Sequence, residues 1–177
     1  EQSRFHIQNS WLFRSLGGFS ASQAEKQVFG WGGMLSVAGK VYKRDNVILQ
    51  GTIGEGIGRY FNDLGGGSGM DVGYTTGGQI KAIPMYGGFL AYQHFWNDQW
   101  RSTATYGFLH ANNYSGAAPG TFKQTQYAEG NLMYRPGGGF TIGGAVLWGD
   151  HAVQDGSRAD VWRMHFVLQY DLVDLGN

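Results

Sequence analysis

Cysteine is absent from the sequence, so the chain has neither a disulfide scaffold nor thiolate zinc sites. Proline occurs only three times, and 15% of the 177 residues are charged, with a formal net charge of zero. A balanced charge gives no overall attraction to nucleic acid. The uninterrupted apolar runs are also far shorter than the ~20 residues that a membrane-spanning helix needs. The sequence therefore predicts no helical membrane anchor and no nucleic-acid partner.

Glycine and aromatic residues are abundant, with 31 glycines and an aromatic share of 15%. Without a collagen period, this much glycine fits many turns or a crowded sheet surface. The length suggests one domain, so residues 1–177 are predicted to form a single region. A mean hydropathy of −0.30 is compatible with a membrane barrel, because only every second side chain of a barrel strand faces lipid.

One segment near the C-terminus, residues 162–172, has the pattern of a long amphipathic strand. Its apolar residues, with Val167 the one exception, fall on one side of a period-2 alternation. Arg163, His165, Gln169 and Asp171 fall on the other side. At about 3.3 Å per residue, the segment spans roughly 35 Å. A strand tilted across a bilayer needs about 9 to 11 residues, so this length suits a membrane strand.

Similar segments recur along the chain and bring the predicted number of strands to about eight. The connections alternate between long and short, which is typical of outer-membrane barrels with short periplasmic turns and longer extracellular loops. Aromatic residues flank the short turns, as in the girdles of such barrels. The pattern predicts an all-β fold, a transmembrane antiparallel up-and-down β-barrel. The predicted strands are 4–15, 28–42, 47–57, 79–96, 100–112, 122–135, 140–149 and 162–172, with short turns at 43–46, 97–99 and 136–139 and a loop at 150–159.

Two other architectures share this periodicity. A soluble ligand-binding β-barrel would turn the apolar faces inward to a core, and periodicity alone does not distinguish inside from outside. A closed barrel of about eight strands would have an interior filled by its own side chains, and it would act structurally or through its loops. Strand length, loop asymmetry and the positions of the aromatic residues favour the membrane over solution.

With the apolar faces in lipid, the polar faces would line a lumen that is richer in basic than in acidic residues. Such a lumen attracts anions, and arginine can bind a carboxylate with two parallel hydrogen bonds. The alternative is that these residues pair with nearby acids and only brace the barrel. The candidate pore-lining residues are Arg101, Arg163, Arg135, Lys40, Arg59, His165, Lys123 and the acid Glu129, and Arg14 and His6 are assigned to the same face.

Signals for catalysis are poor. The glycines of residues 54–58 follow a predicted strand, but no helical pattern comes after them, which argues against a phosphate-binding loop. Ser68 stands in a glycine-rich stretch without the pattern of a nucleophile elbow. The five histidines are scattered and show no local metal-ligand spacing. The sequence therefore predicts no enzyme activity, no cofactor and no metal site.

Several motifs together resemble one known family. They are Gly54–Tyr60, Tyr92–Trp96 followed by Arg101-Ser102 and Tyr106-Gly107, Asn131–Pro136, and the last hairpin with Asp155-Gly156. In order and spacing they are similar to the C-terminal half of the DcaP-like porins of the proteobacterial outer membrane. The members of that family are longer and have a strand-rich N-terminal half.

The resemblance implies that this chain forms half of a porin barrel of about sixteen strands. It also implies a homotrimer in the outer membrane of a Gram-negative bacterium, in contact with lipid. Small anionic solutes, such as dicarboxylates, would be the cargo.

Overall fold

The computed structural model describes residues 5–19, 25–64 and 70–171, which are almost entirely β-strand, turn and loop. Ten strands and two short 3₁₀ helices follow one another in these ranges. In chain order the elements are β1 Phe5–Phe19, β2 Glu25–Tyr42, β3 Asp45–Glu55, η1 Gly58–Tyr60, η2 Asn62–Leu64, β4 Val72–Tyr74, β5 Ile80–Ala82, β6 Pro84–Phe95, β7 Trp100–Ala111, β8 Phe122–Gly137, β9 Phe140–Val153 and β10 Arg158–Tyr170.

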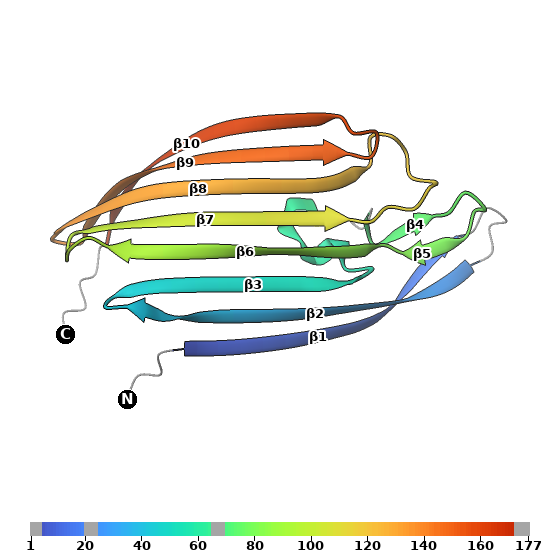
Figure 1. Ribbon diagram of the computed structural model, residues 1–177, viewed down its shortest axis with the longest axis horizontal. Coiled ribbons are helices and arrows are strands. Elements are labelled where there is room, and N and C mark those ends of the chain that lie inside the picture. The colour runs from blue at the N-terminus through green and yellow to red at the C-terminus, as the bar shows by residue number, and fades with distance from the viewer. Residues whose placement is uncertain (1–4, 20–24, 65–69, 172–177) are drawn as a thin grey trace.

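Eight of these strands form one antiparallel up-and-down sheet in the order β1-β2-β3-β6-β7-β8-β9-β10, shown in Figure 1. The two short strands β4 and β5 pair only with each other, in the connection between β3 and β6. The predicted all-β, up-and-down architecture of about eight strands is therefore confirmed. None of the described helices is long and apolar enough to cross a bilayer.

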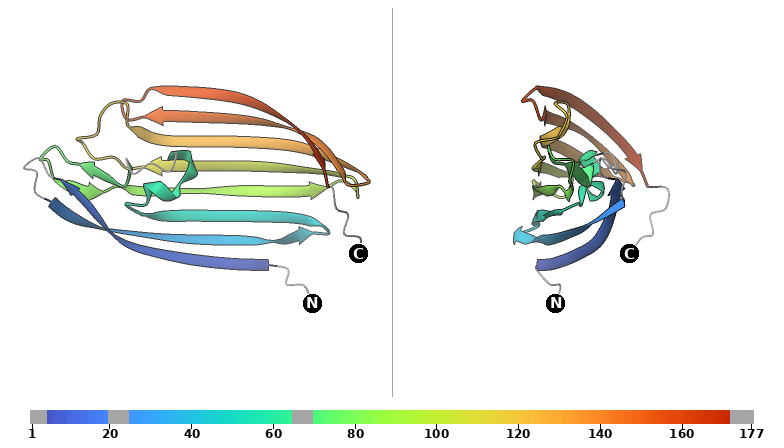
Figure 2. Two further views of the ribbon diagram at one scale, coloured as in Figure 1. Left: turned by 180° about the vertical axis from the view of Figure 1, so that it is seen from behind. Right: turned by 90° about the vertical axis from the view of Figure 1, so that its right-hand side faces the viewer.

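The eight-stranded sheet is open. Within the described residues, β1 pairs with β2 and β10 pairs with β9, but β1 and β10 do not pair with each other. The sheet curves like part of a barrel wall, and η1 and η2 lie inside the curve (Figure 2). A closed eight-stranded barrel, one of the alternatives that the sequence allowed, is therefore not what the chain forms here.

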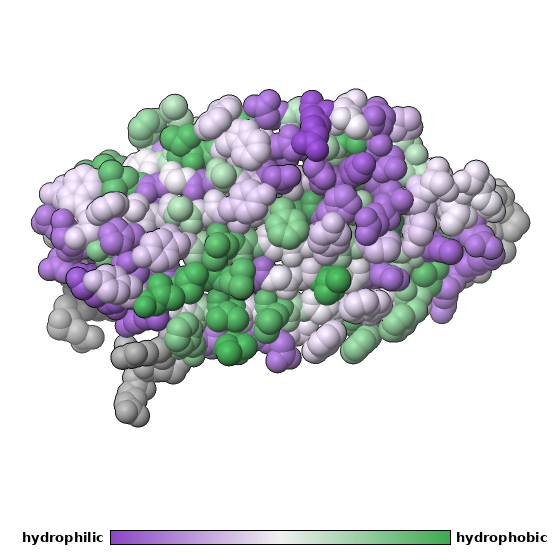
Figure 3. Space-filling model, viewed as in Figure 1, coloured by the Kyte–Doolittle hydropathy of each residue, from purple (hydrophilic) through white to green (hydrophobic). Residues whose placement is uncertain are grey.

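The curvature assigns the two faces of the strands. The face with Ser10, Gln50 and Thr52 lies on the concave side, where these residues line the same hollow as Ile57 and Phe61 of the connection after β3. The opposite, convex face carries the large apolar side chains, and Figure 3 shows them gathered over the middle of β2, β3 and β6. The exposed apolar residues on this face include Phe5, Ile7, Trp11, Phe13, Phe29, Leu35, Leu49, Ile53, Leu90, Tyr106, Phe108, Leu132, Ile142, Val146, Trp162, Met164, Phe166 and Leu168.

Several predicted boundaries are wrong. The loop expected at 150–159 is only a short turn between Val153 and Arg158, because β9 and β10 continue their pairing up to Ala152 and Arg158. The last strand therefore starts before residue 162 and ends at Tyr170, and Leu172 lies outside the described residues.

The strand expected at 79–96 is divided into β5 and β6. The break lies at Ile83, whose N–H donates to the carbonyl of Asp71 while its carbonyl accepts from the N–H of Gly56. Pro84 follows and has no N–H to donate, so it suits the first position of a strand.

A small apolar core lies on the concave side at the loop end of the sheet, the end that carries the long connections β3–β6 and β7–β8. Ile57, Ile83, Met85 and Ala111 are buried there. Partly buried apolar residues of the connection after β3 pack against this core, including Phe61 and Met70. Each large aliphatic side chain buried in this way contributes roughly 1.5–3 kcal/mol. The connection is thus held inside the curve by packing.

Candidate pore-lining surface

Polar side chains of four strands form a transverse row on the concave face, which we call the amide row: Asn46, Gln93, Thr103 and Asn131. Neighbours in this row are register partners on β3, β6, β7 and β8. Asn46 Nδ2 donates to Gln93 Oε1 at 3.3 Å, and Gln93 Nε2 donates to Thr103 Oγ1 at 3.4 Å. The backbone N–H of Thr103 donates to Asn131 Oδ1 at 2.9 Å. The row therefore satisfies much of its own hydrogen-bonding capacity.

Two of the predicted pore-lining residues stand at the ends of the amide row. Lys40 is the register partner of Asn46 on one side, and His165 lies beyond Ala145 on the other. Lys40 and His165 are both exposed. Neither makes an ion pair with a described residue. The positive charge of Lys40 is thus not neutralised by a neighbouring carboxylate of the described residues.

The next row towards the loop end contains Glu129 and Arg163. Glu129 pairs in register with Thr105 and Leu147, and Leu147 pairs with Arg163. Leu147 therefore separates the acid from the base, and no ion pair between them occurs. The expectation that Glu129 could neutralise a cation is not met within the described part of the chain.

Arg101 and Arg135 come together near the short turns. Both line a hollow of about 90 Å³ that also contains Arg44, Phe95 and Thr141. Arg135 Nη2 lies 3.4 Å from Asp171 Oδ2, and both side chains are partly exposed. Arg101 has no ion-pair partner among the described residues. Arg135 is thus paired with an acid, whereas the guanidinium of Arg101 has no carboxylate partner among the described residues.

Arg59 belongs to a different group at the opposite end of the sheet. Its Nε lies 2.8 Å from Asp71 Oδ2, and its backbone N–H donates to Asp71 Oδ1 at 3.1 Å. Arg14 of β1 approaches the same carboxylate at 3.2 Å and also donates to the carbonyl of Gly56. The side chain of Asp71 is only 3% exposed. This acid therefore ties the connection after β3 to β1. Arg59 is paired with it, although the Arg59 side chain remains 44% exposed.

The last predicted residue, Lys123, lies where the register between β8 and β9 shifts, between Phe122 and Gln124. It is partly buried and makes no ion pair with a described residue. The structure thus distributes the eight candidates over the whole concave wall and its rims. Only Arg101 and Arg135 are brought together.

The sequence did not predict the structural roles of two acids, Asp71 and Asp45. Asp71 is an isolated acid after a glycine-rich stretch, and its partners are distant in sequence. Asp45 stands next to a turn and looked like an ordinary turn residue. Both are almost fully buried, which no local pattern indicated.

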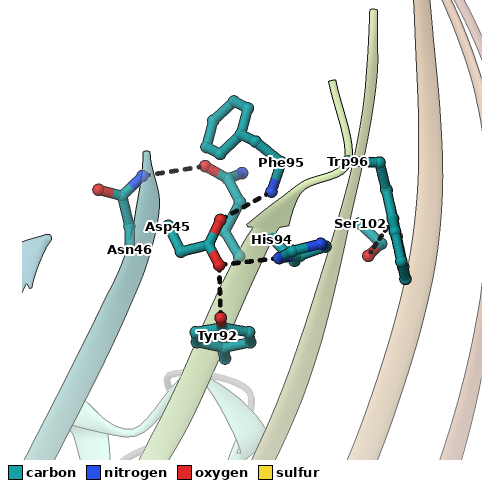
Figure 4. A network of polar contacts seen from close by, with 8 residues as sticks. Asp45, Asn46, Tyr92, His94, Phe95, Trp96 and Ser102 are labelled. Atoms are coloured by element: carbon teal, nitrogen blue, oxygen red, sulfur yellow. Dashed lines mark hydrogen bonds and ion pairs between the residues drawn. The ribbon is translucent and has the colours of Figure 1, made fainter. Parts of the chain in front are cut away.

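Asp45 organises a network on the convex side of the β2–β3 turn (Figure 4). Its carboxylate accepts hydrogen bonds from Tyr92 Oη at 2.6 Å and from the backbone N–H of Phe95 at 3.0 Å, and it lies 2.8 Å from His94 Nδ1. The His94 and Trp96 rings pack edge to face, with their centroids 4.4 Å apart. The network joins β3 to β6 within an aromatic cluster.

Loop groups at the other end are also fixed by hydrogen bonds. The backbone N–H of Ser157 donates to Asp155 at 2.8 Å and lowers the pKa of that carboxyl. Burial raises the pKa of Tyr114, whose hydroxyl donates to the carbonyl of Ala82 at 2.8 Å. No group of three histidine or acidic side chains that could hold a metal ion occurs in the ranges described above.

No family model and no curated protein matches the sequence. Among solved structures, the fold is similar to that of the outer membrane channel DcaP of Acinetobacter baumannii, with a TM-score of 0.69 and 18% sequence identity. The chain has the fold of half a channel. The match covers 94% of this chain and 53% of that channel, so the chain spans about half of the channel's length. At the level of fold, the resemblance to DcaP-like porins that the sequence motifs predicted is confirmed.

Proposed function

We propose that the chain forms part of the wall of an outer-membrane channel that admits small solutes and favours anions. One observation carries the proposal: the curved sheet exposes large apolar side chains on its convex face and a polar surface with unneutralised cations on its concave face. This is the arrangement that a barrel in lipid requires, because the outside contacts hydrocarbon and the inside contacts water.

The soluble alternative is disfavoured by the same observation. A soluble barrel would bury its apolar faces in the interior. Here those faces lie on the convex side, with Trp162, Phe166 and Leu168 exposed by 67%, 87% and 74%. Exposed apolar patches of this extent mark a membrane or an interaction surface.

The channel needs further strands at both edges of the sheet. An unsatisfied backbone group in lipid costs several kcal/mol, so β1 and β10 are not left unpaired in a membrane. We propose that the described region is half of a barrel of about sixteen strands, completed by strands of the same architecture. A homotrimer of such barrels is the oligomer that the sequence resemblance suggests.

The anion preference follows from the concave residues. Lys40, Arg101, Arg163 and His165 have no carboxylate partner among the described residues, and Glu129 is an acid on the same face. In a narrow lumen with low-dielectric walls such an excess raises the local concentration of anions. Dicarboxylates are the proposed class, since an arginine can hold each carboxylate with two hydrogen bonds.

Reversal potentials in planar lipid bilayers test this function. The protein, purified in the assembly in which it is produced, is reconstituted under a salt gradient of potassium chloride. We expect discrete conductance steps and a reversal potential of the sign that chloride permeation gives. Absence of conductance contradicts the channel, whereas a cation-selective conductance contradicts only the anion preference.

A further inference from the structure

A hollow of about 420 Å³ lies between the connection after β3 and the concave wall. Ile57, Tyr60, Phe61 and Asn62 of the connection form one side. The other side is the concave face of the sheet from the edge strand β1 to β8, part of which is visible behind η1 and η2 in Figure 2. Ligand pockets in proteins commonly have volumes of roughly 300–1,000 Å³, so the hollow has room for a small molecule.

Among the described residues, none that lines this hollow has a charged side chain. Arg14, on the same strand as the lining residue Leu12, and Arg59, which precedes Tyr60, are both engaged with the carboxylate of Asp71. The hollow therefore differs from the rims of the concave face, where Lys40 and Arg101 stand without an acid. A carboxylate in the hollow would find no unpaired cation among the described lining residues.

Four polar side chains of the lining are available to a ligand: Ser10, Gln50, Thr52 and Asn62. None of them makes a side-chain hydrogen bond to another residue that the structure describes. The amide row on the same face behaves differently, because its members bond to one another. Unused hydrogen-bonding groups in a partly enclosed space favour a ligand that can satisfy them.

Aromatic rings form the remaining surface. Phe89 is the register partner of both Gln50 and Gly107, and Gly107 is the partner of Tyr127. A Cβ at Gly107 would overlap the Tyr127 ring, so the glycine is what lets that ring lie flat across β7. Phe61 approaches from the connection. Rings thus face hydroxyl and amide groups across the hollow.

We propose that this hollow is a binding site for an uncharged ring that carries hydroxyl groups, such as a sugar ring. Its C–H face would stack on the aromatic side chains, while its hydroxyls would bond to Gln50, Thr52 and Asn62. This site is independent of ion conduction, so its test does not require the channel to conduct.

Methionine methyl resonances provide a local test. Met34 lines the hollow, whereas Met164 lies on the convex face with 70% exposure. The protein carrying ¹³C-methyl methionine is titrated with glucose in phosphocholine micelles, since glycoside detergents would themselves present sugar rings. We expect the Met34 resonance to shift in a saturable way while that of Met164 stays in place. An equal response of the two methyls, or none at Met34, overturns the proposal.

Two matched variants and a second probe sharpen the result. Thr52→Val removes a hydroxyl from the hollow with little change of shape, and Thr105→Val does the same on the concave face outside the hollow. We expect glucose to bind about five-fold more weakly to Thr52→Val, as the loss of one neutral hydrogen bond implies, and normally to Thr105→Val. Succinate should leave Met34 unshifted. A succinate response as large as that of glucose overturns the assignment to an uncharged ligand.

Discussion

The carboxylate of Asp71 lies 2.8 Å from the guanidinium of Arg59, in the same connection between β3 and β6. The same carboxylate is 3.2 Å from Arg14 of β1. Two arginines therefore share one nearly buried acid, and the segment that enters the curve of the sheet is tied to the edge strand. The ion pairs and the core around Ile57 together determine where that segment lies.

Replacing Asp71 with asparagine should release this connection. The change leaves Arg14, whose side chain is 14% exposed, without a carboxylate. Breaking a buried pair costs about 3–5 kcal/mol, and the 44% exposure of Arg59 reduces that figure here to roughly 2 kcal/mol. We expect faster hydrogen exchange of the backbone amides in residues 57–64.

The control for this variant is Asp98→Asn, which removes the partner of Arg44 at an acid whose side chain is 94% exposed. Exchange in residues 57–64 should be unchanged there. Equal protection in Asp71→Asn and the unaltered chain would show that packing alone holds the connection.

The network around Asp45 should stabilise the short-turn end of the sheet. Tyr92→Phe removes a hydroxyl that donates to a nearly buried carboxylate, at 2.6 Å. A hydrogen bond to a charged group contributes about 1.5–3 kcal/mol, so we expect a fall of that order in the free energy of unfolding. Urea unfolding of the reconstituted protein measures it.

Tyr106→Phe is the matched control on the same convex face. Its hydroxyl donates to Gln126 at 2.8 Å, and that bond is exposed and neutral. We expect a loss below about 1 kcal/mol there. Equal losses in the two variants would mean that Asp45 contributes nothing particular to the turn.

Much of the sheet could be predicted because each main strand keeps its period of two over its length. The convex residues of β10, from Trp162 to Tyr170, were all assigned to one face from the sequence. The loop between β9 and β10 was predicted too long. Asp150 and Asp160 are polar, yet they are register partners within the two strands. Polarity in strands that extend past the apolar band resembles loop composition.

The inward connection could not be predicted from local pattern. Its position depends on Asp71 meeting Arg14 and on Ile83 exchanging partners between Asp71 and Gly56, all contacts between residues distant in sequence. The hollow beneath it was missed for the same reason. Gln50 and Thr52 follow the period-2 pattern of β3 and lie on its polar face, but nothing in the sequence indicated that Phe61 would approach them.

Removing the unneutralised cations of the concave face should weaken the anion preference of the channel. We expect the double variant Arg101→Gln, Arg163→Gln to lose most of the anion preference, because both arginines lack an acidic partner in the described structure. Reversal potentials under a salt gradient measure the change. Lys43→Gln is the control, since that residue belongs to the short turn and its ammonium group lies over the Tyr42 ring at 5.1 Å.

The single variant Arg135→Gln should lower the anion preference by less than the double variant does, because it removes one positive charge rather than two. That arginine is already paired with Asp171, so its removal also frees a negative charge at the same end of the sheet. An unchanged reversal potential in the double variant would contradict the assignment of Arg101 and Arg163 to the solute path.

A pair of adjacent substitutions in β10 tests which face of the sheet meets lipid. Phe166 points to the convex side and is 87% exposed, whereas Val167 pairs with Gly143 on the concave side. An arginine on the lipid face of a barrel costs about 2–4 kcal/mol near the bilayer midplane, while the lumen tolerates it. We therefore expect Phe166→Arg to lower the folded fraction in lipid vesicles, read from the heat-modifiable migration of the protein in gels. Val167→Arg should fold as the unaltered chain does, because its side chain would enter water rather than hydrocarbon. The reverse order, with Val167→Arg the more damaging, would place the concave face against lipid and contradict the channel.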